Sequence, residues 1–382
     1  MELNAIGAYG EWAAGLVGRK VGRYSLRSGK FKNVDAWRKQ ARARVWDLLA
    51  PPELKKSPPP RLEWTGAYDG LHVEKLSWQL PWGPRTEAVF LKPKSAGPRE
   101  KLPAVLALHD HGGNKYFGWR KIAQVDNELH NSMKTHRAGC YGGLAWANEI
   151  AKRGYAVLCH DTFPFASRRV KVTDCIAPVQ AGVKELTAAE RMEDIEAYNR
   201  WAGNHEHIMA KALFSAGTSW PGVYVVEDQA ALGILSARPD VDAKRIACGG
   251  LSGGGMRTVF LAGLDERIRT CFCAGFFTTW VDLVLYKQWT HTWMTYVPLL
   301  PRDLDFTEVL GLRAPKPAVV LHCTEDPLFT NSEVQIGGKI LKDVYKRANA
   351  PQAFKLSTYS GGHKFDAPMQ EEAFAWVEKG MK

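Results

Sequence analysis

The segment RIACGGLSGGGMRTVFLAG, residues 245–263, places Ser252 among five closely spaced glycines between two apolar runs. Glycine is less stable than alanine in regular structure by about 0.5–1 kcal/mol, so such a cluster indicates a tight geometric requirement. The order strand, turn, helix, with GLSGG at the turn, fits the G-x-S-x-G pattern of a nucleophile elbow. In that turn a strained backbone exposes the serine hydroxyl. The segment therefore predicts Ser252 as a nucleophile.

Two other glycine-rich motifs do not fit this segment. A P-loop requires a lysine after its last glycine, and Met256 occupies that position. A dinucleotide-binding turn requires G-x-G-x-x-G, but Leu251 and Thr258 stand where glycines are needed. An ordinary glycine-rich turn is the remaining alternative, so the prediction depends on whether the serine has catalytic partners.

A serine hydroxyl needs a histidine to accept its proton and a carboxylate to orient that histidine. In chains with a nucleophile elbow, the acid and then the histidine follow the serine, each just beyond a strand. Asp326 follows the apolar run PAVVLHC, and His363 follows the strand-like run AFKLSTYS. We predict a catalytic triad of Ser252, Asp326 and His363. Glu325 is the alternative acid, because either neighbour could face the histidine.

Backbone N–H groups must stabilise the oxyanion that forms during acyl transfer. The amide of Gly253, directly after the serine, is the first predicted donor. The second is expected from Gly112 or Gly113, in the HDHGG segment that follows the apolar run AVLAL. Glycine at these positions lets an amide turn inward.

Histidines outside the triad allow a different reading. His109 and His111 form an H-x-H pair that could bind a metal, but no third ligand has suitable spacing. We therefore predict no metal site and no cofactor. His205 and His207, in the segment NHEH, point apart on a helix, and we expect both to be solvated.

Alternating strand-like and helix-like segments from about residue 100 onward predict an α/β fold with a mainly parallel sheet and helices on both faces. Residues 61–94 alternate apolar and polar side chains, which predicts antiparallel strands ahead of that sheet. Residues 1–60 predict a helical extension that ends in the proline-rich linker PPELKKSPPPR. We expect one domain over residues 61–382, with a helical insert at about 165–217.

The motifs HDHGG, GLSGGG, TEDP and GGHKF resemble those of the α/β-hydrolase superfamily, in particular its bacterial dienelactone hydrolase-like and acetyl xylan esterase-like branch. The resemblance covers about residues 100–380 and implies the α/β-hydrolase fold. It also implies that Ser252 is the nucleophile, His363 the base, Asp326 the acid and Gly253 an oxyanion donor. Dienelactone hydrolases themselves have a cysteine at the elbow, so Ser252 argues against that particular reaction.

Composition narrows the choice of partners and compartment. The net charge is +11, but the basic residues are spread out without a nucleic-acid-binding motif, so we predict no nucleic-acid partner. No apolar run reaches the length of about 20 residues that a membrane span needs, and we predict no membrane association. Five of the seven cysteines lie in strand-like apolar runs, which indicates buried thiols and a reducing compartment. We expect a cytoplasmic location, with export left open if a signal peptide has been removed, and the oligomeric state is left open.

Together these features predict a serine hydrolase that cleaves a small-molecule carboxylic ester, of a carbohydrate or aromatic type, through an acyl-enzyme on Ser252. Loops beyond the C-terminal ends of the strands line the ligand site in α/β sheets. The predicted substrate-binding residues on these loops are Arg168, Arg169, Tyr116, Trp119 and Phe277. An arginine there could hold a carboxylate.

Two alternatives remain open. The first is a serine peptidase of the prolyl-oligopeptidase type, although the roughly 60 residues before the first strand cannot build the β-propeller usual in that group. The second is a catalytically silent α/β-hydrolase that serves as a binding protein, although every predicted triad position is filled.

Overall fold

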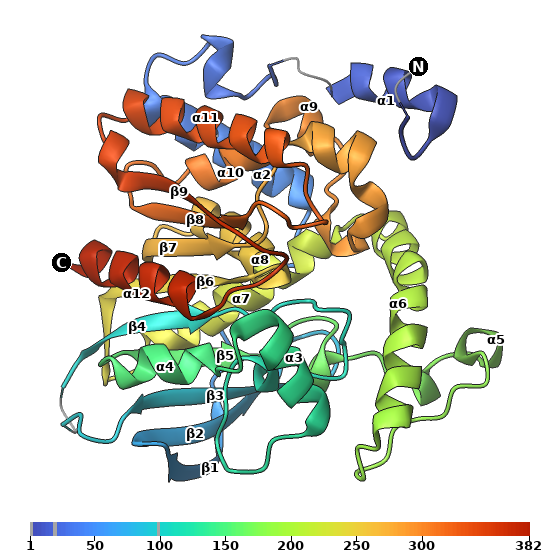
Figure 1. Cartoon of the computed structure of the whole chain (residues 1–382), viewed down its shortest axis with the longest axis vertical. Coiled ribbons are helices and arrows are strands. Elements are labelled where there is room, and N and C mark those ends of the chain that lie inside the picture. The colour runs from blue at the N-terminus through green and yellow to red at the C-terminus, as the bar shows by residue number, and fades with distance from the viewer. Residues whose placement is uncertain (1–2, 18–20, 98–99) are drawn as a thin grey trace.

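The computed structural model describes residues 3–17, 21–97 and 100–382. Within these residues, nine strands form one sheet in the order β1-β2-β3-β5-β4-β6-β7-β8-β9 (Figure 1). The strands are β1 Arg61–Tyr68, β2 Leu71–Trp78, β3 Thr86–Pro93, β4 Leu102–Ala107, β5 Ala156–His160, β6 Val241–Leu251, β7 Ile268–Ala274, β8 Ala318–Cys323 and β9 Phe354–Tyr359. Part of the predicted N-terminal extension, at residues 1–2 and 18–20, lies outside the described residues.

The sheet has an antiparallel and a parallel part. β1, β2, β3 and β5 pair antiparallel in that order. β5, β4, β6, β7, β8 and β9 pair parallel. The predicted fold class is confirmed: antiparallel strands come first in the sequence, and a mainly parallel sheet follows them. Because parallel strands are joined by crossovers, their carboxyl ends meet at one edge of the sheet, where the candidate site lies.

Helices cover both faces of the sheet. The helices are α1 Gly10–Val17, α2 Val34–Leu49, α3 Asn131–Tyr141, α4 Trp146–Lys152, α5 Ala177–Gln180, α6 Met192–Ser215, α7 Trp220–Ser236, α8 Gly253–Leu264, α9 Leu300–Asp303, α10 Phe306–Gly311, α11 Asn331–Arg347 and α12 Ala367–Met381. Side chains of α2, α7, α8, α10 and α11 share one apolar core, and those of α3, α4 and α12 share the other (Figure 1).

The central strands supply both cores, which explains their continuous apolar runs. In β4, Ala104 and Leu106 belong to one core, whereas Val105 and Ala107 belong to the other. Successive side chains of a strand point to opposite faces, so a strand covered on both faces must be apolar throughout. The five cysteines predicted in strands are buried there, namely Cys159, Cys248, Cys271, Cys273 and Cys323.

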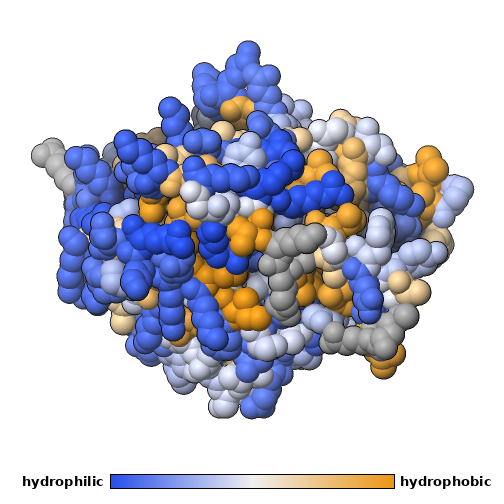
Figure 2. All heavy atoms as spheres, turned by 90° about the horizontal axis from the view of Figure 1, so that it is seen from above, coloured by the Kyte–Doolittle hydropathy of each residue, from blue (hydrophilic) through white to orange (hydrophobic). Residues whose placement is uncertain are grey.

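The N-terminal segment packs on the sheet through one helix. α2 buries Trp37, Ala41 and Val45 completely in the larger core. α1, in contrast, exposes apolar side chains such as Trp12. Figure 2 shows hydrophobic patches between hydrophilic ones on the end of the molecule where α1 lies. The division into an extension and one domain stays a prediction.

Two of these helices lie in long connections between strands. α6 is the main helix of the region predicted as an insert, and it stands on the right side of the molecule in Figure 1. α3 lies in the connection between β4 and β5. Among the described residues, no helix is both long enough and apolar enough to cross a membrane.

Candidate active site

Ser252 lies at the corner between β6 and α8, with φ 56° and ψ −120°. A residue other than glycine at positive φ is strained, and such strain is concentrated at functional sites. The Ser252 N–H donates to the carbonyl of Ala274 at 2.9 Å, and the Ser252 carbonyl accepts the N–H of Met256 at 2.8 Å. The strand and the helix therefore hold the strained corner from both sides. This is the geometry expected of a nucleophile elbow.

The glycines around Ser252 permit close backbone contact with the end of β4. A Cβ atom on Gly250 or Gly254 would lie 2.2 or 2.1 Å from the carbonyl oxygen of Leu108. A Cβ atom on Gly253 would lie 2.8 Å from the backbone nitrogen of His111. Side chains at these three positions would push the elbow away from the segment after β4. This close approach is the geometric requirement that explains why the chain has glycines here despite their lower stability in regular structure.

The predicted acid and histidine are in contact. Asp326 follows β8 and is buried, and its Oδ2 lies 2.6 Å from Nδ1 of His363, which follows β9. Glu325 is exposed, and its backbone N–H donates to the carbonyl of Gly361. The geometry therefore favours Asp326 over Glu325 as the partner of the histidine.

The second nitrogen of His363 is available for a substrate or nucleophile. Nε2 is buried without a hydrogen-bond partner among the described residues. The ring packs beside Gly275, where a Cβ atom would lie 3.0 Å from Cε1 of His363. Gly275 directly follows Ala274, which pairs with Leu251 across β6 and β7, so this glycine lies next to Ser252. Three loops from β6, β8 and β9 thus bring the predicted triad together at one edge of the sheet.

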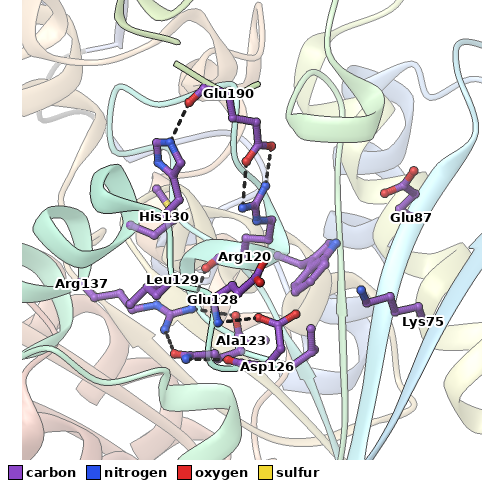
Figure 3. Close-up of a pocket in the computed structure, with 14 residues that line it drawn as sticks. Lys75, Glu87, Arg120, Ala123, Asp126, Glu128, Leu129, His130, Arg137 and Glu190 are labelled. Atoms are coloured by element: carbon purple, nitrogen blue, oxygen red, sulfur yellow. Dashed lines mark hydrogen bonds and ion pairs between the residues drawn. The ribbon is translucent and has the colours of Figure 1, made fainter. Parts of the chain in front are cut away.

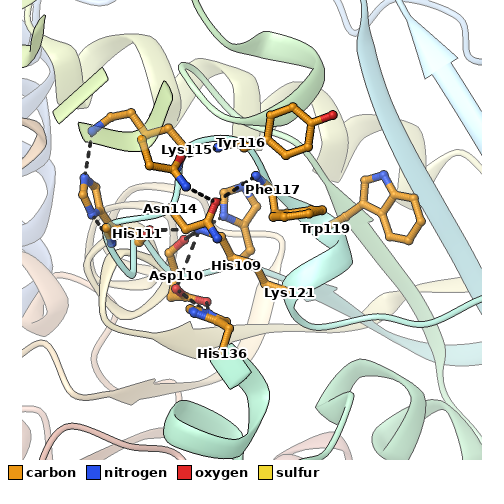
Figure 4. Close-up of polar contacts among 12 residues, drawn as sticks. His109, Asp110, His111, Asn114, Lys115, Tyr116, Phe117, Trp119, Lys121 and His136 are labelled. Atoms are coloured by element: carbon orange, nitrogen blue, oxygen red, sulfur yellow. Dashed lines mark hydrogen bonds and ion pairs between the residues drawn. The ribbon is translucent and has the colours of Figure 1, made fainter. Parts of the chain in front are cut away.

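The segment after β4, residues 109–115, is called the β4 loop below, and a buried polar network anchors it (Figure 4). Nε2 of His136 lies 3.2 Å from Oδ1 and 3.1 Å from Oδ2 of Asp110, and the Tyr141 hydroxyl donates to Oδ1. Nζ of Lys121 donates to the carbonyls of Asp110 and His111 at 2.8 and 2.9 Å. Burial opposes ionisation of Asp110, but His136 and Lys121 lower the pKa of its carboxyl group well below the ordinary value.

The two glycines of the β4 loop do not occupy equivalent positions. Gly112 has φ 52°, and a Cβ atom there would lie 2.3 Å from Oδ2 of Asp110. The N–H of Gly113 donates to Nδ1 of His111 at 3.0 Å, so it is already engaged. The predicted oxyanion role of Gly113 is therefore at odds with the structure. The backbone nitrogen of His111 lies against Gly253 instead.

No protein-family model matches the sequence. A relative from Bacillus subtilis (strain 168), named "Putative hydrolase YtaP", is 27% identical over 318 residues, which cover 80% of this chain and 87% of that protein. A solved structure described as a "putative acetyl xylan esterase" from Bacteroides fragilis has a TM-score of 0.66 and 18% identity, covering 93% of this chain and 83% of that chain. A glucuronoyl esterase from Solibacter usitatus has a TM-score of 0.64 and 12% identity, covering 94% of this chain and 98% of that chain.

The chain has the α/β-hydrolase fold. The strand order, the elbow after β6 and the loops after β8 and β9 agree with the motifs that indicated this fold.

The two arginines predicted to bind substrate are already paired with carboxylates. Arg168 is buried, and its guanidinium donates to the carboxylate of Glu227 and to the carbonyl of Trp82. Both terminal nitrogens of the guanidinium are engaged and the side chain is buried, so the structure argues against the predicted contact with substrate. Arg169 is less enclosed, and it lies 3.6 Å from the carboxylate of Glu185.

The predicted aromatic residues lie in different environments. Phe277 is 1% exposed in the core, so its predicted contact with substrate is not supported. The Tyr116 hydroxyl donates to Glu190 at 2.9 Å. Trp119 lines a polar pocket of about 540 Å³, together with Arg120 and Arg137 (Figure 3). This pocket contains none of the three triad candidates.

Two residues near the site were not predicted from the sequence. His291 lies between the rings of Phe276 and Phe329, and burial lowers its pKa to about 4. Glu206 is buried on α6, where its carboxylate accepts hydrogen bonds from His111 and Lys115. The sequence around Glu206 is polar and on a helix, so nothing in it indicated burial.

The same helix corrects one prediction about histidines. His207 is exposed as expected, but His205 is buried and stacks on Trp201 with ring centroids 4.9 Å apart. His109 and His111 also have separate partners, because Nδ1 of His109 contacts the Asp110 carbonyl at 3.0 Å, whereas His111 contacts Glu206. Among the described residues, no group of three or more His, Cys, Asp or Glu side chains is arranged to hold a metal.

Proposed function

We propose that this chain is a serine esterase that forms an acyl-enzyme on Ser252. The observation that carries the proposal is the 2.6 Å contact between His363 and Asp326, with the other nitrogen of His363 unpartnered beside the strained elbow. His363 takes the proton of the Ser252 hydroxyl as its Oγ attacks the ester carbonyl, and then gives that proton to the leaving alcohol. Asp326 holds the ring and stabilises the imidazolium. Water hydrolyses the acyl-enzyme by the same steps.

We propose that two backbone amides stabilise the oxyanion. The Gly253 amide follows the nucleophile at the start of α8, where the helix dipole also favours negative charge. The second donor is the amide of His111, because its nitrogen lies against Gly253 and the Gly113 amide is engaged elsewhere. Both donors belong to backbone segments that are held by the surrounding structure, as oxyanion stabilisation requires.

We propose a carbohydrate ester as the substrate. The acetyl xylan esterase and the glucuronoyl esterase that share this fold support that class. The nearby cations are paired with carboxylates, Arg168 with Glu227 and Lys115 with Glu206, which favours an ester without a free carboxylate. A cytoplasmic location stays a prediction.

Labelling with a fluorophosphonate probe tests the nucleophile. Ser252→Ala should abolish labelling and lower the hydrolysis of acetylated sugars by about 10⁴-fold or more, because triad members act as a unit. Ser236→Ala, in α7, is a matched control that should label like the wild type. Equal labelling of Ser252→Ala and wild type would contradict the proposal.

Paired variants of neighbouring carboxylates test the acid. Asp326→Asn should lower kcat by about 10⁴-fold, because the histidine would lose its correct tautomer. Glu325→Gln should leave kcat near the wild-type value, since this side chain is exposed. If kcat fell equally in the two variants, the contact between Asp326 and His363 would have no specific role in catalysis.

A further inference from the structure

Glu206 joins three segments that are far apart in the sequence. Its Oε1 accepts the Nε2–H of His111 at 2.9 Å and a hydrogen bond from Nζ of Lys115, both from the β4 loop. Its Oε2 accepts the hydroxyl of Thr292 at 2.6 Å and the N–H of Trp293 at 3.1 Å. We call residues 288–296 the cap segment. One buried carboxylate on α6 therefore accepts hydrogen bonds from both the β4 loop and the cap segment.

The contact with Glu206 determines the orientation of the His111 ring. Nδ1 of this ring accepts the N–H of Gly113 at 3.0 Å, so the ring proton is on Nε2 and points at Glu206. Burial and the nearby Lys115 lower the pKa of His111, which keeps the ring neutral in this arrangement. The side chain of His111 is thus held at both nitrogens.

The backbone of His111 is held on the opposite side. Lys121 is buried, and its Nζ donates to the carbonyls of Asp110 and His111. Lys121 therefore anchors the main chain and Glu206 anchors the ring. Between these two anchors lies the His111 nitrogen that faces Gly253. Because an oxyanion donor must point at the reacting atoms within a fraction of an ångström, the loss of one anchor would affect catalysis.

The cap segment also packs against the loop that carries Asp326. Thr292 and Trp293 bind Glu206, and the preceding residue, His291, packs against Phe329 with ring centroids 5.0 Å apart. Phe329 lies three residues after Asp326, and the intervening Leu328 N–H donates to Oδ1 of Asp326 at 3.0 Å. Glu206 is thus linked through the cap segment to the loop of the predicted acid.

We propose that Glu206 is a positioning residue that holds the His111 amide at the oxyanion and the cap segment over the triad. The proposal rests on the proposed function of Ser252. Burial opposes its ionisation, but His111 and Lys115 lower the pKa of Glu206, so the carboxylate is charged when it accepts these hydrogen bonds. A helix outside the catalytic loops would then complete the active site.

The test is Glu206→Gln, assayed with p-nitrophenyl acetate by stopped flow. The variant should lower the acylation and deacylation rate constants by the same factor, about ten- to hundredfold, since both steps pass through an oxyanion. The Michaelis constant should change less than kcat, because the ground-state ester does not need this donor. Glu196→Gln, an exposed residue of the same helix, is the matched control and should leave both rate constants unchanged.

A second variant keeps the test decisive if Glu206→Gln does not fold. Thr292→Val removes one donor and leaves the charge of Glu206, and it should slow both steps by about two- to fivefold. Unchanged rate constants in the folded variants, or a loss in acylation alone, would overturn the positioning role. Fluorophosphonate labelling of the wild type distinguishes the two proposals, because the absence of the label on Ser252 would overturn the proposed function itself.

Discussion

The neighbouring strands β4 and β5 both lead into a His-Asp pair, yet the two carboxyl groups differ in pKa. His109-Asp110 follows β4, and His160-Asp161 stands at the end of β5. In each pair, Nδ1 of the histidine contacts the carbonyl oxygen of the following aspartate, at 3.0 and 2.9 Å. Both aspartates are 1% exposed. The local sequence and backbone geometry are therefore alike.

Their neighbours are different. Asp110 faces His136 and Lys121, which lower the pKa of its carboxyl group despite burial. Among the residues that the structure describes, Asp161 accepts hydrogen bonds only from uncharged donors, the N–H of Trp119 at 2.9 Å and the N–H and hydroxyl of Ser167 at 3.1 and 2.7 Å. Burial raises the pKa of Asp161 to about 6, because these hydrogen bonds do not offset the lost hydration. The partners that tertiary packing brings to a buried carboxyl group therefore decide its pKa.

Asp110→Asn should have the largest effect, because it leaves Lys121 buried beside a neutral side chain. We expect a loss of about 3–5 kcal/mol in the free energy of unfolding at pH 7. The ester-hydrolysis rate should fall as well, since Asp110 precedes His111. Urea denaturation with Asp126→Asn, an exposed residue, as the control measures the difference.

The pH dependence of this loss has a definite sign. The folded-state pKa of Asp110 is below the unfolded value, so its contribution is complete above about pH 4 and is lost as the pH falls. An equal loss at pH 3 and pH 7 would contradict the assigned charge.

Asp161→Asn should show the opposite pH dependence. The folded state binds the Asp161 proton more tightly, because its pKa of about 6 is above the ordinary value. The wild type should therefore lose stability relative to Asp161→Asn as the pH rises from about 4 to 6, by up to about 3 kcal/mol, and stay level above that range. Urea denaturation of both proteins at intervals from pH 4 to pH 8 measures this difference. A flat difference across the range would show that Asp161 is ionised throughout, like Asp110.

Substitutions that remove a single hydrogen-bond donor to either carboxyl group should change the free energy of unfolding least. Tyr141→Phe removes a hydroxyl that donates to the charged Asp110, and it should cost about 1.5–3 kcal/mol at pH 5. Ser167→Ala removes a hydroxyl that donates to Asp161, which is largely protonated at that pH, and it should cost about 0.5–1.5 kcal/mol. Denaturation at pH 5 ranks the two variants. If Ser167→Ala cost more stability than Tyr141→Phe, Asp161 rather than Asp110 would be the charged carboxyl group at pH 5.

Some features of the site could be predicted because they depend on residues close together in the chain. The elbow at Ser252 is a short turn that needs small neighbours, and the strand before it needs apolar residues on both faces. The ends of β8 and β9 could be located in the same way, and the contact between Asp326 and His363 agrees with the predicted pairing.

Other features could not be predicted because their partners lie far away in the sequence. Arg168 looked available to a substrate, but Glu227 on α7 neutralises it. Glu206 lies between two histidines that the sequence predicted to be solvated, but its carboxylate accepts hydrogen bonds from the β4 loop and the cap segment. Polar residues carry no local signal for burial, since a charged side chain can be buried only when another segment supplies its partner.

The sequence by itself therefore determined the order of strands and helices, the strained serine corner and the candidates for its acid and base. These properties follow from hydrophobic periodicity and from the conformational freedom of glycine, which act over a few residues. Only the tertiary structure decided that Asp326 rather than Glu325 meets His363, that the His111 amide faces Gly253, and that Asp110 and Asp161 differ in pKa. Electrostatic interactions and hydrogen bonds depend on distances between segments, and those distances exist only after the chain has folded.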